Sequence, residues 1–102
     1  MRFAFTEDQT MFRDAVRDVL TRECPPTVIR EAWDKKTGHS PKVWATLAET
    51  GFVGCTAAEA AGGMESTPLD TCLPFEEAGY AGLTGPIVET TAVAIPLLAA
   101  LG

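Results

Sequence analysis

The chain has 102 residues, a net charge of −6 at pH 7 and 46% hydrophobic residues, which fits one globular domain and argues against disorder along its whole length. Its 8 lysines and arginines are scattered among 14 acidic residues, so we expect no binding to the phosphate backbone of a nucleic acid. The 3 cysteines lack CxxC spacing and there is 1 histidine, so the sequence contains no recognisable metal site.

No segment of the sequence is typical of a secretory signal or a membrane span. The N-terminus has no apolar stretch and becomes acidic at Glu7. The longest apolar stretch, residues 92–101, is shorter than the roughly 20 residues that a spanning helix needs. The odd number of cysteines and the lack of a secretory signal favour a reducing, cytoplasmic location.

The first predicted helix begins at a capping box. Thr6 and Gln9 are three residues apart, so each side chain can bond the backbone N–H of the other. Apolar residues then recur with helical period: Met11, Phe12, Ala15, Val16, Val19 and Leu20. Cys24-Pro25-Pro26 ends this helix, because a proline disfavours helix at the residue before it.

A short helix and a polar loop are expected next. The helix starts at Pro26 or Thr27 and presents an apolar face made of Val28, Ile29, Ala32 and Trp33. The loop covers residues 34–39, and we expect His39 to be a surface residue in it. No cysteine or serine is placed with His39 in a nucleophile pattern.

The third predicted helix lies between two clear signals. Ser40 is an N-cap followed by a proline at the first helical position, and Gly51 is suited to the position just after the helix. We expect the short apolar run that starts at Phe52 to be buried. Beyond it, Gly62-Gly63 centres a loop and favours a turn with positive φ over a phosphate cradle, because no lysine follows.

A fourth helix is predicted from the cap-plus-proline signal at Thr67. It contains Pro74, so either it starts later than this signal suggests or it is kinked there. We expect Gly79 to close it. The final helical segment spans residues 87–101, where Pro96 splits or bends it.

The acidic pair Glu76-Glu77 is the one candidate for acid–base chemistry. Adjacent helical residues point about 100° apart, so the two carboxylates cannot flank one bond. We expect one to be solvated and the other to make a local hydrogen bond. The large aromatic residues and the cysteines are expected in the core: Trp33, Trp44, Phe52, Phe75, Cys24, Cys55 and Cys72.

These elements predict an all-α, up-and-down domain of five to six helices, without a convincing strand. No residue is predicted to be catalytic, to bind a cofactor or to bind a metal. The residues alone do not name a function.

The order and spacing of several segments resemble the N-terminal helical domain of the acyl-CoA dehydrogenases. The matching segments are Phe3-x-Phe5-Thr6-Glu7-Asp8-Gln9, Val16-Arg17-Asp18-Val19-Leu20, Trp44-x-x-Leu47-Ala48-Glu49-x-Gly51-Phe52-x-Gly54, Glu59-x-x-Gly62-Gly63 and Glu76-Glu77-x-Gly79. Two departures lie in the glycine loop, where Ala57 and Ala61 replace the proline and tyrosine usual in the family.

The resemblance implies a flavoenzyme that acts on acyl-CoA. In the family, FAD accepts a hydride from the β-carbon while a glutamate removes the α-proton, giving a 2-enoyl-CoA. The central β domain and C-terminal helical bundle, which supply the flavin site and that glutamate, are absent from residues 1–102. The resemblance therefore implies an incomplete domain that is inactive alone and belongs to an oligomeric enzyme.

By alignment position, the resemblance places four residues in the wall of the acyl pocket: Val88, Glu89, Thr90 and Thr91. Two alternatives to an enzyme fragment stay open. The first is a free-standing helical module that docks onto a separate flavoprotein subunit; the apolar end of the chain suggests it, because such a surface favours contact with a partner. The second is an inactive remnant. The sequence is therefore consistent both with part of an enzyme and with a protein that is not an enzyme.

Overall fold

The computed structural model describes residues 4–36 and 38–102. Phe3 of the family-like opening and Thr37 of the predicted loop lie outside the described residues. Within the described residues the elements are α1 (Glu7–Glu23), α2 (Pro26–Asp34), α3 (Pro41–Glu49), the 3₁₀-helix η1 (Glu59–Ala61), α4 (Pro68–Ala81), the π-helix η2 (Glu89–Ala94) and α5 (Ile95–Leu101). No strand is present in this part of the chain, so the predicted all-α class is confirmed.

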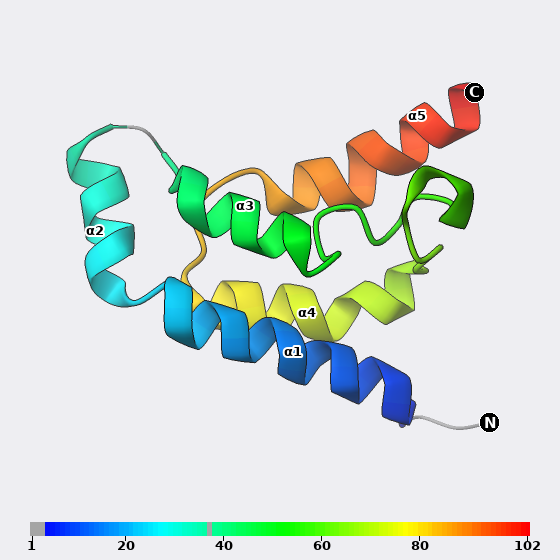
Figure 1. Ribbon diagram of the computed structural model, residues 1–102, viewed down its shortest axis with the longest axis horizontal. Helices are drawn as coiled ribbons and strands as arrows, with labels where there is room; N and C mark the ends of the chain where they lie inside the picture. Colours follow the sequence, from blue (N-terminus) through cyan, green and yellow to red (C-terminus); the bar gives the residue numbers. More distant parts are fainter. Residues whose placement is uncertain (1–3, 37) are drawn as a thin grey trace.

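Apart from α2, the helices alternate in direction along the chain, as an up-and-down domain requires (Figure 1). Figure 1 shows α1 and α4 running the same way, while α3 and the η2–α5 segment run back, and α2 lies across one end. The molecule measures 43 × 33 × 20 Å, so it is flattened.

The starts of α1 and α4 are fixed by two capping boxes that contact one another. Thr6 caps α1 together with Gln9, and Thr67 caps α4 together with Asp70. The Gln9 side-chain amide donates to Asp70 Oδ1 at 2.7 Å. Because this bond joins the first turns of both helices, it fixes their parallel register.

The end of α3 directs Phe52 into the core. The N–H of Gly51 donates to the Ala48 carbonyl at 3.1 Å and the N–H of Phe52 to the Leu47 carbonyl at 3.3 Å, the pattern of a Schellman motif. Phe52 is 0% exposed. Its ring centroid lies 6.1 Å from that of Phe12 and 5.7 Å from that of Phe75.

The rest of the core comes mainly from α1, α3 and α4, whereas α5 buries no residue. The buried cluster consists of Val16, Val19, Leu20, Cys24, Val43, Leu47, Phe52, Cys55, Ala78 and Ile87. The predictions for Phe52, Cys24 and Cys55 are confirmed, and Trp44 and Phe75 are half-buried against this cluster.

Two predicted core residues lie on the surface instead. Trp33 is 65% exposed, because α2 lies across one end of the domain and buries only Ala32. Cys72 is exposed, because the packed face of α4 passes through its neighbours Thr71 and Leu73. Its thiol donates to the Pro68 carbonyl at 3.4 Å.

The predicted end of α4 at Gly79 is also wrong. The helix starts at Pro68, continues through the buried Pro74 and ends at Ala81, followed by Gly82, whose φ is 70°. The N–H of Leu83 donates to the Ala78 carbonyl at 2.9 Å, so Gly82 is the residue that needs the left-handed conformation. Gly79 is an interior residue of the helix.

The two glycines of α4 should therefore respond oppositely to alanine. A Cβ at Gly79 meets nothing within 4 Å, so Gly79→Ala should stabilise the fold by about 0.5–1 kcal/mol through helix propensity. Gly82→Ala should destabilise it by about 1–2 kcal/mol, because alanine is strained at positive φ. Urea unfolding of both variants measures this; a loss of stability in Gly79→Ala would contradict the observed helix end.

Candidate functional site

Residues 87–101 form one continuous helical segment that contains all four predicted pocket-wall residues. It begins as α-helix, passes into the π-helix η2 and ends as α5. Val88 is 46% exposed, Glu89 is exposed and Thr90 is half-buried. Thr91 is 0% exposed, so the structure turns Val88 and Glu89 towards the outside and Thr91 towards the core, with Thr90 between them.

Thr91 is held by two hydrogen bonds to the chain that follows α3. Its hydroxyl donates to the Val53 carbonyl at 2.8 Å, and its carbonyl accepts from the Thr56 hydroxyl at 2.5 Å. We call this pair of bonds the Thr56–Thr91 clamp. It attaches the start of the final segment to the turn that buries Phe52.

A cavity of about 420 Å³ lies beside this clamp, between α4, the glycine loop and the η2–α5 segment. Its lining residues are Thr56, Ser66, Pro68, Thr71, Phe75, Ala92 and Pro96. The Thr56 hydroxyl already bonds Thr91, and the Thr71 hydroxyl donates to the Pro68 carbonyl at 2.8 Å. The cavity is therefore lined by apolar groups and hydroxyls, without a charged side chain.

The acidic pair Glu76-Glu77 is divided between solvent and the helix interface. Glu76 is exposed, as expected of one member. Glu77 does not make the expected local hydrogen bond: its Oε1 accepts from Arg17 Nη2 of α1 at 2.6 Å. The hydrogen bond from Arg17 lowers the pKa of Glu77 more than partial desolvation raises it, so this group is an ionised link between two helices.

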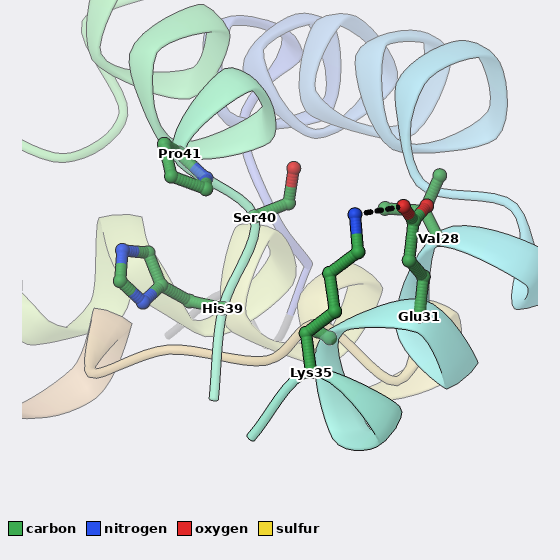
Figure 2. Close-up of a pocket in the computed structure, with 7 residues that line it drawn as sticks. Val28, Glu31, Lys35, His39, Ser40 and Pro41 are labelled. Carbon is green, nitrogen blue, oxygen red and sulfur yellow. Dashed lines mark hydrogen bonds and ion pairs between the residues drawn. The ribbon is translucent and has the colours of Figure 1, made fainter. Parts of the chain in front are cut away.

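A second opening, of about 310 Å³, lies between α2 and the start of α3. Figure 2 shows the ion pair between Lys35 and Glu31 on one side of it and the ring of His39 pointing away from that pair. Ser40 Oγ accepts from the Val43 N–H as the cap of α3. His39 is half-buried rather than a plain surface residue, and the polar groups drawn here do not converge on one point.

The glycine loop does not offer a phosphate site for FAD. Gly62 has a φ of 88°, which confirms the predicted turn. Its N–H donates to the Glu59 carbonyl, and the N–H of Gly63 donates to the Ala58 carbonyl. A Cβ on Gly63 would lie 2.1 Å from the Ala57 carbonyl oxygen, so this glycine serves a close backbone contact. The amides of both glycines are thus used within the loop, so the glycine pair does not fit a flavin phosphate.

Other kinds of site are absent from the described part of the chain. Residues 4–36 and 38–102 contain no group of three or more His, Cys, Asp or Glu side chains that could hold a metal ion. Within the same residues, no helix is both long enough and apolar enough to cross a membrane.

Comparison with known proteins identifies the family. Residues 6–102 match the model of the acyl-CoA dehydrogenase N-terminal domain. The chain belongs to this family. Over 86 residues it is 31% identical to the mitochondrial long-chain specific acyl-CoA dehydrogenase of Rattus norvegicus, covering 84% of this chain and 20% of that protein. It is 28% identical over 94 residues to acyl-CoA dehydrogenase IpdE2 of Mycolicibacterium smegmatis, covering 91% of this chain and 30% of that protein.

This acyl-CoA dehydrogenase N-terminal domain thus spans about a fifth to a third of the length of the relatives it matches. No solved structure matches the chain. The family therefore rests on sequence similarity, and the helical structure agrees with it.

Sequence reasoning missed the partners that organise this domain. The Arg17–Glu77 pair joins residues 60 positions apart, and the Thr56–Thr91 bond joins residues 35 apart. The local signal, Pro96, predicts a disturbed helix because it cannot donate a backbone hydrogen bond, but it does not identify Thr91 or Thr56 as the residues involved.

Glu77→Gln should change how the stability of the domain depends on pH. The folded-state pKa of Glu77 is lowered, so its charge stabilises the fold above the ordinary glutamate pKa, and that contribution is lost as the pH falls through the lowered value. The wild type should therefore be the more stable protein at neutral pH, by a modest margin because the Arg17 side chain is 52% exposed.

The gap between wild type and Glu77→Gln should close in acid, as measured by urea unfolding at several pH values. Glu76→Gln is the matched control, since Glu76 is the exposed neighbour, and it should show no such pH-dependent gap. An equal gap at every pH would mean that the Arg17–Glu77 ion pair does not stabilise the fold.

Proposed function

We propose that the chain acts as the N-terminal domain of an FAD-dependent acyl-CoA dehydrogenase, which forms an α,β double bond in an acyl-CoA thioester. The observation that carries the proposal is the family match over residues 6–102. The flavin would supply the hydride-accepting chemistry. The described residues would supply part of the acyl pocket and a packing surface.

The rest of the active site would come from other domains of the same enzyme. We propose that residues 1–102 are completed by a central β domain and a C-terminal helical bundle, in an oligomer. The small share of each relative that the chain covers, 20% and 30%, supports the part of this proposal that concerns further domains. A charged acid–base residue is not available within the acidic pair of α4, because Glu77 is committed to Arg17 and Glu76 faces solvent.

We also propose how the four candidate residues contribute to the acyl pocket. Val88, Glu89 and Thr90 would form the wall, since they are exposed or half-buried in the domain by itself. Thr91 would hold that wall in place through its bonds to Val53 and Thr56.

A cytoplasmic location is part of the proposal, supported by three free cysteines, Cys24, Cys55 and Cys72.

A second candidate function is supported by the exposure of α5. Its leucines Leu97, Leu98 and Leu101 are 56%, 65% and 76% exposed. Such a surface favours contact with another protein surface, which in this alternative is a separately encoded flavoprotein subunit. The coding sequence after Gly102 distinguishes the two: an in-frame β domain supports the first function, and a stop codon beside a separate flavoprotein gene supports the second.

The chain alone should bind no flavin and oxidise no acyl-CoA. The protein is purified in the presence of excess FAD, desalted, and its visible absorbance spectrum is recorded, with a complete acyl-CoA dehydrogenase as the positive control. We expect no flavin band, because the amides of Gly62 and Gly63 are bonded within the loop. A retained flavin band at one equivalent would refute the proposal that other domains supply the flavin site.

The chain alone should also expose an apolar surface that another protein surface normally covers. We expect binding of a hydrophobic dye or self-association in light scattering, and both should decrease in the variant Leu98→Glu. Ala45→Glu on α3 adds the same charge at another exposed position and should leave both unchanged. A monodisperse wild-type monomer that binds no dye would argue against a docking role for α5.

A further inference from the structure

The final helical segment changes its hydrogen-bond register just before Pro96. The N–H of Ile95 donates to the Thr90 carbonyl, five residues back, which is the bond of a π-helix. The next carbonyl along is that of Thr91, and its donor in the same register would be the N–H of residue 96. A proline has no N–H, so this position leaves the Thr91 carbonyl without that donor.

The Thr56 hydroxyl takes the place of the missing amide. It donates to the Thr91 carbonyl at 2.5 Å. Thr91 is 0% exposed, so water is not available as a substitute, and a buried carbonyl without a partner would be costly. The second bond of the clamp, from the Thr91 hydroxyl to the Val53 carbonyl at 2.8 Å, fixes the same residue from its side chain.

A π-helical turn also rotates the side chains that follow it in the chain relative to the side chains that precede it. It inserts one extra residue into an α-helix, and one residue corresponds to a rotation of about 100°. The turn in η2 therefore sets the angle between the side chains of Val88 and Glu89, at its start, and those of Leu97 and Leu98, after it.

We propose that Thr56 is a positioning residue for this segment. Its hydroxyl replaces the hydrogen-bond donor that Pro96 lacks, and it thereby holds η2 in the π register that turns Thr91 inward and leaves Val88 and Glu89 outward. The geometry alone carries this assignment. Only its consequence, that Thr56 sets which side chains face the acyl group, rests on the proposed function.

A double-mutant cycle between Thr56 and Pro96 tests the assignment in the 102-residue chain. Thr56→Val keeps the shape of the side chain but removes the donor, and it should raise the unfolding equilibrium constant by on the order of ten-fold. In the background Pro96→Ala the same change should cost much less, because an alanine at this position has an N–H that can donate to the Thr91 carbonyl. Urea unfolding of the four proteins gives the coupling.

Two further variants separate the hydrogen bond from a general effect of substitution. Thr56→Ser retains a hydroxyl and should restore most of the stability lost in Thr56→Val. Thr46→Val is the matched control, because the Thr46 hydroxyl donates to the Lys42 carbonyl at 3.0 Å at a solvent-accessible site, and it should have little effect. Hydrogen exchange of the amides in η2 should accelerate in Thr56→Val, while the amides of α1 should not change.

Three results would overturn the assignment. They are an equal cost of Thr56→Val in the wild-type and Pro96→Ala backgrounds, a Thr56→Ser variant as unstable as Thr56→Val, and unchanged exchange in η2. If Thr56→Val alone does not fold, the double variant with Pro96→Ala must fold, and its failure to fold refutes the proposal. None of these measurements involves flavin or acyl-CoA. The assignment of Thr56 can therefore be refuted without refuting the proposed enzymatic function, and the reverse also holds.

Discussion

The packing of Phe52 is the interaction on which the rest of the domain depends. It follows α3 directly, its backbone closes that helix, and its ring contacts Phe12 of α1 and Phe75 of α4. Burial of one such side chain contributes about 1.5–3 kcal/mol. The Thr56–Thr91 clamp extends from the same turn, since Val53 and Thr56 supply its acceptor and its donor. The core position of Phe52 thus also determines where the candidate pocket wall lies.

Helix starts and the end of α3 could be predicted because their signals are local. The capping box at Thr6, the cap at Ser40 and the glycine at Gly51 each act within a few residues, and the structure contains all three. Trp33 and Cys72 were misplaced because apolar character does not tell which face of a helix meets a neighbour. The sequence predicts a helix end at Gly79 because glycine often follows the last residue of a helix. The identity of the residue does not show whether its φ is positive, as at a helix end, or helical, as in a helix interior.

The candidate site was less accessible to sequence reasoning. The positions of Val88, Glu89, Thr90 and Thr91 came from the family resemblance, and their exposure could not be deduced from it. Three of these residues lie in the π-helix η2 (Glu89–Ala94), and the hydroxyl that bonds the Thr91 carbonyl comes from 35 positions earlier in the chain, so no local pattern shows that Thr91 is buried while Val88 and Glu89 are exposed. Similarly, Glu77 could be recognised as a buried, paired carboxylate only once α1 and α4 were seen side by side.

The hydrogen bond between Gln9 and Asp70 couples the local unfolding of α1 to that of α4. Gln9 Oε1 accepts from the Thr6 N–H at 2.8 Å, its amide reaches Asp70 at 2.7 Å, and Asp70 accepts from the Thr67 N–H at 2.8 Å. The first turns of α1 and α4 thus share one continuous chain of hydrogen bonds. Fraying of either helix removes a partner from the other, so the two ends should open as one cooperative unit rather than separately.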